Sequence, residues 1–245
     1  MVLFQDEKAW CLCQIDGYSR NEQKTDSMTK GLAPQTSELF DAVTRLDCIK
    51  PFVLVGGTAL ALQLNARQSE DLDFMRWKRG PKDKLEVGWP NIKKELSTIG
   101  TIESEDILGF DHVVFVVNGV KLSFYAAPRK QLSAMQPIAF RNNLRIADVR
   151  TIGALKMEVM LRRAKFRDYY DLYSILKSGI DIQDLIPLAL EHSDHKLKLK
   201  NLLAMITNGD FFSRDSQFDK LSPVYDVTPT DIQEYIKAQL PHDSK

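Results

Sequence analysis

Cysteine is scarce in this sequence. Only Cys11, Cys13 and Cys48 occur among its 245 residues. Three cysteines cannot form a disulfide framework, and Cys11 and Cys13 lack the spacing of metal ligands and have no second pair. We therefore expect a reducing cytoplasm as the compartment of the protein.

Long apolar runs and an excess of one charge are also missing. No stretch approaches the ~18 consecutive apolar residues that span a bilayer, and the N-terminal residues lack the apolar segment of a signal peptide. The 33 basic and 33 acidic residues give a net charge of zero, which offers no overall attraction to nucleic acid but permits a local basic patch. With 44% hydrophobic residues, we expect a soluble chain with one large domain or two small ones.

Two common catalytic signatures are absent as well. The sequence contains neither a phosphate-binding Walker A loop nor the nucleophile elbow of a serine hydrolase. Its four histidines, His112, His192, His195 and His242, show no metal-ligand spacing. We interpret His192 and His195, which share an expected helix, as solvent-facing residues.

The order of the expected elements indicates a mixed fold. Residues 1–34 are polar and contain glycine and proline, so they are expected to form an N-terminal extension and linker. Residues 35–147 alternate short apolar runs with helical patterns, and residues 148–245 are mostly helical in their periodicity. We expect an α/β (α+β) fold, in which a mixed sheet flanked by helices precedes a mostly helical C-terminal domain.

Individual elements follow from the same patterns. Asn118-Gly119 between two β-rich runs predicts a hairpin. The expected strands span 52–55, 72–75, 113–117, 120–125 and 143–146. The expected helices span 35–47, 58–66, 92–99, 148–163, 167–177, 181–206 and 229–239.

One short stretch carries the chemistry. An apolar run over 52–55 ends in Gly56-Gly57, and Asp71-x-Asp73 follows on a second short strand. Because side chains alternate along a strand, both carboxylates point the same way, and a hard cation such as Mg²⁺ is the natural occupant between them. Glycine lets the backbone approach a ligand, and the N-terminus of the next helix offers N–H groups to a phosphate. An isolated Asp-x-Asp is usually only a pair of surface carboxylates, but the combination indicates phosphoryl or nucleotidyl transfer.

Two strings in the sequence are similar to known families. The two glycines followed by Asp-x-Asp resemble the nucleotidyltransferase superfamily, which has the DNA polymerase beta-like fold. The fuller string LVGGTALALQLNARQSEDLDF looks like the AbiEii/AbiGii toxin family of bacterial toxin–antitoxin systems, and KMEVMLRRAKFRDYYDLYSIL resembles the helical motif of that family. The matching residues of the helical motif are Lys156, Arg163, Arg167, Asp168 and Asp171. The resemblance covers roughly residues 35–240.

The resemblance implies an enzyme that uses Mg²⁺ or Mn²⁺ and a nucleoside triphosphate (NTP). It implies transfer of a nucleotidyl group to a hydroxyl of RNA, such as tRNA, or of a protein, and a cognate antitoxin as partner. Asp71 and Asp73 would bind the metal and act in catalysis, and Lys156 would steady the triphosphate. The other residues expected to contact the nucleotide are Gly56, Gly57, Thr58, Arg67, Ser69, Arg163, Arg167, Asp168 and Asp171.

The charges of the helical motif can also be interpreted physically. On one continuous helix, Lys156, Arg163 and Arg167 fall within about 40° of one another and form a cationic row facing the carboxylates. A helix break near residues 164–165 would remove that row. The alternative interpretation is that Arg167 and Asp171 form an ordinary i,i+4 ion pair on a solvated face. An unpaired lysine in an apolar helix is costly, so we expect Lys156 to point toward the Asp pair. Lys156→Ala is then expected to change the free energy of unfolding by at most about 1 kcal/mol.

Ser123 departs from the superfamily pattern, which usually has a third carboxylate on a later strand. In two-metal transfer that carboxylate helps to activate the attacking hydroxyl. Its loss is consistent with a one-metal mechanism, with a different base, or with a decayed enzyme that only binds nucleotide or protein. A phosphotransferase of the aminoglycoside-nucleotidylating kind is a third alternative, which shares only the first motif. The aromatic side chains Phe166, Tyr169, Tyr170 and Tyr173 are expected to pack the helical core.

Overall fold

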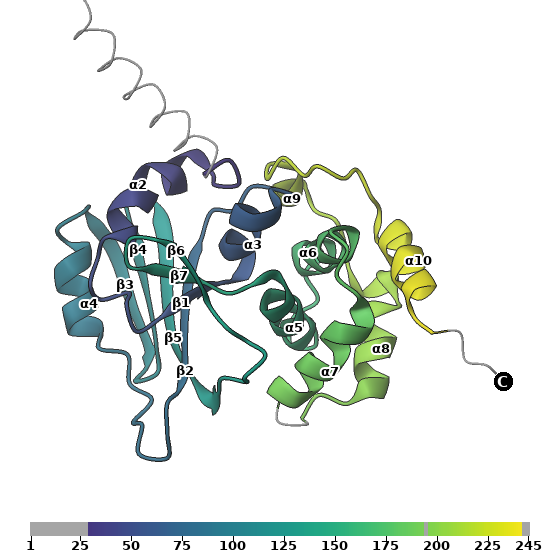
Figure 1. Cartoon of the computed structure of the whole chain (residues 1–245). Coiled ribbons are helices and arrows are strands. Elements are labelled where there is room, and N and C mark those ends of the chain that lie inside the picture. Colours follow the sequence, from purple (N-terminus) through teal and green to yellow (C-terminus); the bar gives the residue numbers. More distant parts are fainter. Residues whose placement is uncertain (1–28, 194–195, 242–245) are drawn as a thin grey trace, which may run out of the picture.

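A computed structural model describes residues 29–193 and 196–241 of the chain. The expectations for Cys11, Cys13, His195, His242 and residues 1–28 lie outside these residues. The expected fold class is confirmed, because a mixed sheet with flanking helices precedes a mostly helical region (Figure 1).

Seven strands form one mixed sheet in the described part of the chain. They are β1 (Val53–Val55), β2 (Leu72–Lys78), β3 (Ile102–Gly109), β4 (His112–Val117), β5 (Val120–Lys130), β6 (Ile138–Arg141) and β7 (Leu144–Ile146). Their order across the sheet is β3-β4-β5-β2-β1-β7-β6. Strand β2 pairs in parallel with β5, and β1 with β7, whereas the other neighbours are antiparallel.

The Asn118-Gly119 hairpin is confirmed. Asn118 (φ 48°) and Gly119 (φ 77°) adopt the left-handed conformation that a tight two-residue turn needs, and Val117 pairs with Val120. The sequence pattern does not predict β3, because its side chains are mostly polar and exposed, as is common at a sheet edge. Strand β2 continues to Lys78, beyond its expected end at residue 75.

The two faces of the sheet differ because successive residues of a strand point to opposite sides. On one face Leu72, Phe74, Leu122 and Phe124 are buried, and the rings of Phe74 and Phe124 stack with centroids 5.0 Å apart. The opposite face carries alternate residues of β2, β4 and β5, including Asp73, and it faces the C-terminal helices. Alternation thus separates a packed apolar core from the face available for chemistry.

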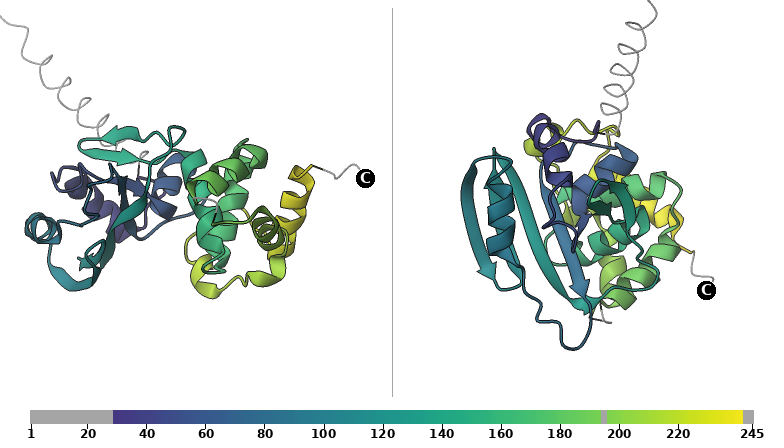
Figure 2. Two further views of the ribbon diagram at one scale, coloured as in Figure 1. Left: turned by 90° about the horizontal axis from the view of Figure 1, so that it is seen from below. Right: turned by 60° about the vertical axis from the view of Figure 1, so that its left-hand side comes forward.

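Three helices accompany the sheet: α2 (Pro34–Thr44), α3 (Gly56–Leu64) and α4 (Trp89–Leu96). Helices α2 and α4 lie on the side away from the C-terminal helices (Figure 1). Helix α3 lies between the sheet and those helices, which it contacts directly. Figure 2 shows the sheet and the C-terminal helices side by side.

The described residues from 148 onward contain helices and no strand. The helices are α5 (Val149–Met160), α6 (Phe166–Lys177), α7 (Ile182–His192), α8 (Leu199–Ile206), the 3-10 helix η1 (Gly209–Phe211), α9 (Ser216–Asp219) and α10 (Pro229–Gln239). Helix α5 begins after Asp148, whose carboxylate accepts a hydrogen bond from the backbone N–H of Thr151 at 2.7 Å. Helix α3 packs against both α5 and α6, so it connects the two halves of the molecule.

The aromatic side chains of α6 are part of the helical core, as expected. Phe166, Tyr169, Tyr170 and Tyr173 are buried, and Tyr169 stacks on Phe212 with ring centroids 4.1 Å apart. Among the residues that the structure describes, no helix combines the length and the apolar character needed to cross a membrane.

Candidate active site

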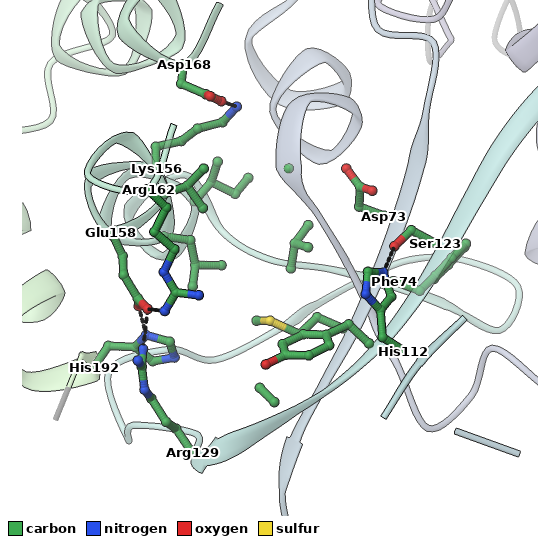
Figure 3. Close-up of a pocket in the computed structure, with 18 of the residues that line it drawn as sticks. Asp73, Phe74, His112, Ser123, Arg129, Lys156, Glu158, Arg162, Asp168 and His192 are labelled. Atoms are coloured by element: carbon green, nitrogen blue, oxygen red, sulfur yellow. Dashed lines mark hydrogen bonds and ion pairs between the residues drawn. The ribbon is translucent and has the colours of Figure 1, made fainter. Parts of the chain in front are cut away.

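A cavity of about 700 Å³ lies between the sheet and helix α5 (Figure 3). Its volume is in the range of sites for small organic ligands. The sheet contributes Asp73, Met75, His112, Ser123, Tyr125 and Arg129. The helical wall contributes Ile152, Leu155, Lys156, Glu158, Arg162, Arg163, Asp168 and His192.

Two glycines shape the turn between β1 and α3. Gly56 has a φ of +71°, and a Cβ atom there would lie 2.8 Å from Oδ2 of Asp73. A Cβ atom on Gly57 would lie 2.7 Å from a guanidinium nitrogen of Arg67. Gly56 therefore leaves room for the Asp73 carboxylate, whereas Gly57 leaves room for the guanidinium group of Arg67.

Thr58 and Ser69 support the Asp-x-Asp segment from inside the protein. The Thr58 hydroxyl, which is buried, lies 2.9 Å from Oγ of Ser69 and donates to the backbone carbonyl of Asp71. The backbone N–H of Ser69 donates to the carbonyl of Gly31 at 2.9 Å. Because the Thr58 hydroxyl is used internally, the predicted phosphate contact of this residue is left to its backbone N–H at the start of α3.

The two motif carboxylates have different surroundings. Asp71 forms an ion pair with Lys121, in which Nζ of Lys121 lies 2.8 Å from Oδ2 of Asp71. Asp73 lines the cavity and makes no hydrogen bond or ion pair with any residue that the structure describes. Burial raises the pKa of Asp73, the charge of Lys121 opposes that rise, and the charge of Asp71 adds to it. A bound cation would therefore stabilise the ionised form of Asp73.

The metal implied by the resemblance fits Asp73 directly, whereas Asp71 is not among the residues that line the cavity and would have to exchange its ion pair with Lys121 to bind a metal. No group of three or more His, Cys, Asp or Glu residues within 29–193 and 196–241 is arranged to hold a metal ion. Mg²⁺, however, commonly binds through one or two carboxylates and completes its shell with water and substrate phosphates. The Asp73 carboxylate, which lines the cavity and has no hydrogen-bond or ion-pair partner among the described residues, suits that mode of binding.

Lys156 is not the unpaired cation that the sequence suggests. Its Nζ lies 2.7 Å from Oδ1 of Asp168 and 2.6 Å from Oδ2 of Asp171, and all three residues are buried. The argument that Lys156 needs the Asp71–Asp73 pair to offset its charge is therefore wrong, because α6 supplies two carboxylates. Removing Lys156 would leave buried charge uncompensated, so the limit of about 1 kcal/mol for Lys156→Ala does not apply and a larger loss is expected. Lys156 nevertheless lines the cavity, and its charge lowers the pKa of Asp73, against the larger effect of burial.

Arg67 connects the sheet half to α6. Its Nε and Nη2 donate to the two carboxylate oxygens of Asp171 at 2.7 and 2.8 Å. Burial raises the pKa of Asp171, but the charges of Arg67 and Lys156 outweigh burial and lower it to about 2. Asp171 is thus shared by two cations, and the alternative i,i+4 pair between Arg167 and Asp171 is wrong.

The cationic row expected along one helix is also wrong. Helix α5 ends at Met160 and α6 begins at Phe166, so a 3.6-residue period does not extend across both. Arg163, in the connection, is half exposed and pairs with Asp168 at 3.2 Å. Arg167 makes no hydrogen bond or ion pair within the described residues and lines a separate cavity of about 340 Å³.

Ser123 lies directly opposite Asp73 in the sheet. The parallel register pairs the two residues, so both side chains point into the cavity. His112 of β4 reaches the same place, with Nε2 3.2 Å from Oγ of Ser123 (Figure 3). His112 is not among the site residues predicted from the sequence, although the hairpin contains the signal. Pairing Val117 with Val120 places residue 112 opposite residue 125.

Glu158 organises the other end of the cavity (Figure 3). It accepts hydrogen bonds from Arg129, from Arg162 at 2.9 Å and from Nδ1 of His192 at 3.1 Å. The indole N–H of Trp77 donates to Nε2 of His192 at 2.9 Å, which leaves Nδ1 as the donor to Glu158. His192 is therefore buried between the two halves, and its interpretation as a solvent-facing residue is wrong.

Because of the partners of Glu158, we expect the protein to lose stability in acid. Burial alone would raise its pKa, but the hydrogen bonds from His192 and Arg129 outweigh burial and lower the pKa to about 2. A carboxylate with a lowered pKa contributes stability above its ordinary pKa of 4.5 and loses that contribution as the pH falls toward 2. The lowered pKa corresponds to a contribution of about 3 kcal/mol to the free energy of unfolding at neutral pH, and about 2 kcal/mol of it should be lost by pH 3.

The measurement is denaturant unfolding of the wild type and Glu158→Gln between pH 7 and pH 3. The difference in unfolding free energy between the two proteins should shrink with falling pH. Glu234→Gln, on the exposed side of α10, is the matched control and should show no such trend. A difference that stays constant over this range would contradict the assigned role of Glu158.

The sequence of this chain is similar to a known protein family and to a protein of Aquifex aeolicus. Residues 39–245 match the family described as nucleotidyl transferase AbiEii toxin, type IV TA system. An uncharacterized protein of Aquifex aeolicus is 24% identical over 217 residues, which cover 85% of this chain and 96% of that protein.

Two solved structures are similar to this chain at low sequence identity. A candidate nucleotidyltransferase from H. pylori is 20% identical with a TM-score of 0.47, and the match covers 84% of this chain and 96% of that chain. The Megavirus polyadenylate synthase is 11% identical with a TM-score of 0.41, and the match covers 72% of this chain but only 39% of the synthase.

The family match includes both motifs that build the cavity, the Gly56–Asp73 segment and the Lys156–Asp171 segment. It also extends over most of the chain, including the helical region. The chain therefore belongs to the AbiEii toxin family and is a nucleotidyltransferase.

Proposed function

We propose that this protein binds an NTP together with Mg²⁺ in the cavity and transfers the nucleotidyl group to a hydroxyl of RNA or protein. Asp71 and Asp73 would hold the metal. The observation that carries the proposal is Asp73, a half-buried carboxylate that lines a cavity of about 700 Å³ and has no hydrogen-bond or ion-pair partner among the described residues. Bound Mg²⁺ would neutralise phosphate charge and polarise the reacting phosphoryl group.

The opposite wall offers positive charge to the triphosphate. Lys156 and Arg163 both line the cavity, and the charge of each lowers the pKa of Asp73, against the larger effect of burial. Asp168 and Asp171 hold the Lys156 ammonium in one position, so little reorganisation is needed when phosphate arrives. The first turn of α3 adds backbone N–H groups beside Asp73.

The apolar part of the cavity lining suits the nucleoside. Met75, Tyr125, Ile152, Leu155 and Val159 line the same cavity as Asp73 and Glu158. Apolar surface with a few charged groups at its ends is the usual composition of a small-molecule site. Family membership supports a toxin role that a cognate antitoxin restrains, with RNA, such as tRNA, or a protein as the acceptor.

The test is transfer of label from each α-labelled NTP, with Mg²⁺, to total RNA, purified tRNA or cell protein. We expect incorporation of label into one acceptor class, and loss of that incorporation when Mg²⁺ is chelated. Calorimetric titration with the same NTPs measures binding separately. Binding without transfer to any acceptor would favour a decayed, nucleotide-binding protein, and the absence of both would refute the proposal.

A further inference from the structure

His112 and Ser123 form a hydrogen-bonded pair beside Asp73. The three residues come from adjacent strands, β4, β5 and β2, and all line the cavity. The register pairs Ser123 with Asp73, and Nε2 of His112 lies 3.2 Å from Oγ of Ser123. The His112 ring also contacts the ring of Tyr125 edge to face, with centroids 5.7 Å apart, which restricts its orientation.

Transfer to a hydroxyl needs a group that accepts the hydroxyl proton. In the proposed function, Asp73 would hold the metal and would not be free to accept that proton. Asp168 is fully buried between two cations, and Glu158 has three hydrogen-bond donors and a pKa of about 2, so both are poor bases. Both ring nitrogens of His192 are engaged, one with Trp77 and one with Glu158.

His112 differs from these groups, because its only hydrogen bond within the described residues joins it to the Ser123 hydroxyl. Imidazole is the side chain that most often accepts protons in catalysis near neutral pH. A serine hydroxyl can donate to Nε2 and accept from a second hydroxyl at the same time. The pair therefore has the connectivity of a proton relay that ends at His112.

We propose that His112 is the general base of nucleotidyl transfer, acting through the Ser123 hydroxyl; this inference rests on the proposed function. The acceptor hydroxyl gives its proton to Oγ of Ser123, while the Ser123 proton passes to Nε2 of His112. The acceptor oxygen forms a bond to the α-phosphorus of the NTP. The bond from that phosphorus to the pyrophosphate oxygen breaks, pyrophosphate leaves with the electron pair, and the imidazolium returns its proton to water.

The experiment compares the wild type with His112→Ala, Ser123→Ala and the double variant His112→Ala/Ser123→Asp. Transfer is measured with the labelled NTP and acceptor of the wild-type assay, and NTP affinity is measured by calorimetry. Each alanine variant should lose about 10²-fold or more in kcat, with Kd for the NTP changed by less than about twofold. Free imidazole should restore part of the His112→Ala loss, and the carboxylate at position 123 should restore at least about tenfold in the double variant.

Val116→Ala is the matched control, because it lies on the same strand and the same face as His112 but outside the cavity lining. It should transfer as the wild type does. Wild-type rates in His112→Ala would overturn the relay and leave the proposed function standing. A parallel loss of NTP affinity, or a loss that neither imidazole nor Ser123→Asp restores, would assign His112 a structural role instead. If the wild type itself transfers nothing, the proposed function fails and the relay fails with it.

Discussion

Asp73→Asn is expected to reduce nucleotidyl transfer by about 10³-fold or more. The change removes the negative charge that would hold the metal but keeps the size of the side chain. Burial raises the pKa of Asp73, which means that the ionised carboxylate is disfavoured in the fold. The neutral amide should therefore leave the melting temperature unchanged or raise it, so that activity and stability move independently.

Transfer assays and thermal unfolding of the same preparations test this expectation. Asp106→Asn, on the exposed edge strand β3, removes one carboxylate that makes no hydrogen bond or ion pair with the described residues, and it serves as the control for net charge. It should retain full activity. An Asp73→Asn protein that transfers nucleotide at the wild-type rate would show that the metal is held elsewhere.

Asp171→Asn is expected to lower the free energy of unfolding by about 3–5 kcal/mol. Asp171 is buried and compensates both Arg67 and Lys156, so its loss leaves two buried cations with one carboxylate fewer. The melting temperature should fall by roughly 10 °C. Asp184→Asn breaks only the exposed pair with Arg150 and should cost less than about 1 kcal/mol.

A double variant separates charge compensation from packing. Arg67→Met/Asp171→Leu removes one cation together with the shared carboxylate, and Lys156 keeps Asp168. It should recover much of the stability that Asp171→Asn loses, because apolar side chains often replace a buried ion pair without cost. Equal unfolding temperatures for the wild type and Asp171→Asn would contradict the role assigned to this cluster.

The sequence predicted those parts of the site that depend on local geometry. A strand period of two pointed to Asp73, which lines the cavity, but equally to Asp71, which pairs with Lys121 and is not in the cavity lining. An Asn-Gly turn was enough to place the β4–β5 hairpin. The same turn brings His112 toward the face of the sheet that carries Asp73. Edge strand β3 was missed because its exposed, polar side chains resemble those of a loop.

The partners of the buried charges could not be predicted in this way. Arg67 and Asp171 are 104 residues apart, and only the packing of α3 against α6 brings them together. Lys156 seemed unpaired because helical periodicity describes one helix, whereas its partners lie on the next. His192 seemed exposed because Trp77, its partner, comes from the far end of β2.

The distance along the chain between Arg67 and Asp171 also sets the time at which the enzyme can be assembled. A ribosome adds about 5–20 residues per second, so about 5–20 s separate the synthesis of these two residues. During that interval the emerging sheet carries Asp71 and Asp73 but lacks the helical wall of the cavity. A nascent chain, or a fragment that stops before α6, therefore carries Asp71 and Asp73 without the fixed lysine, and the enzyme becomes complete only late in its own translation.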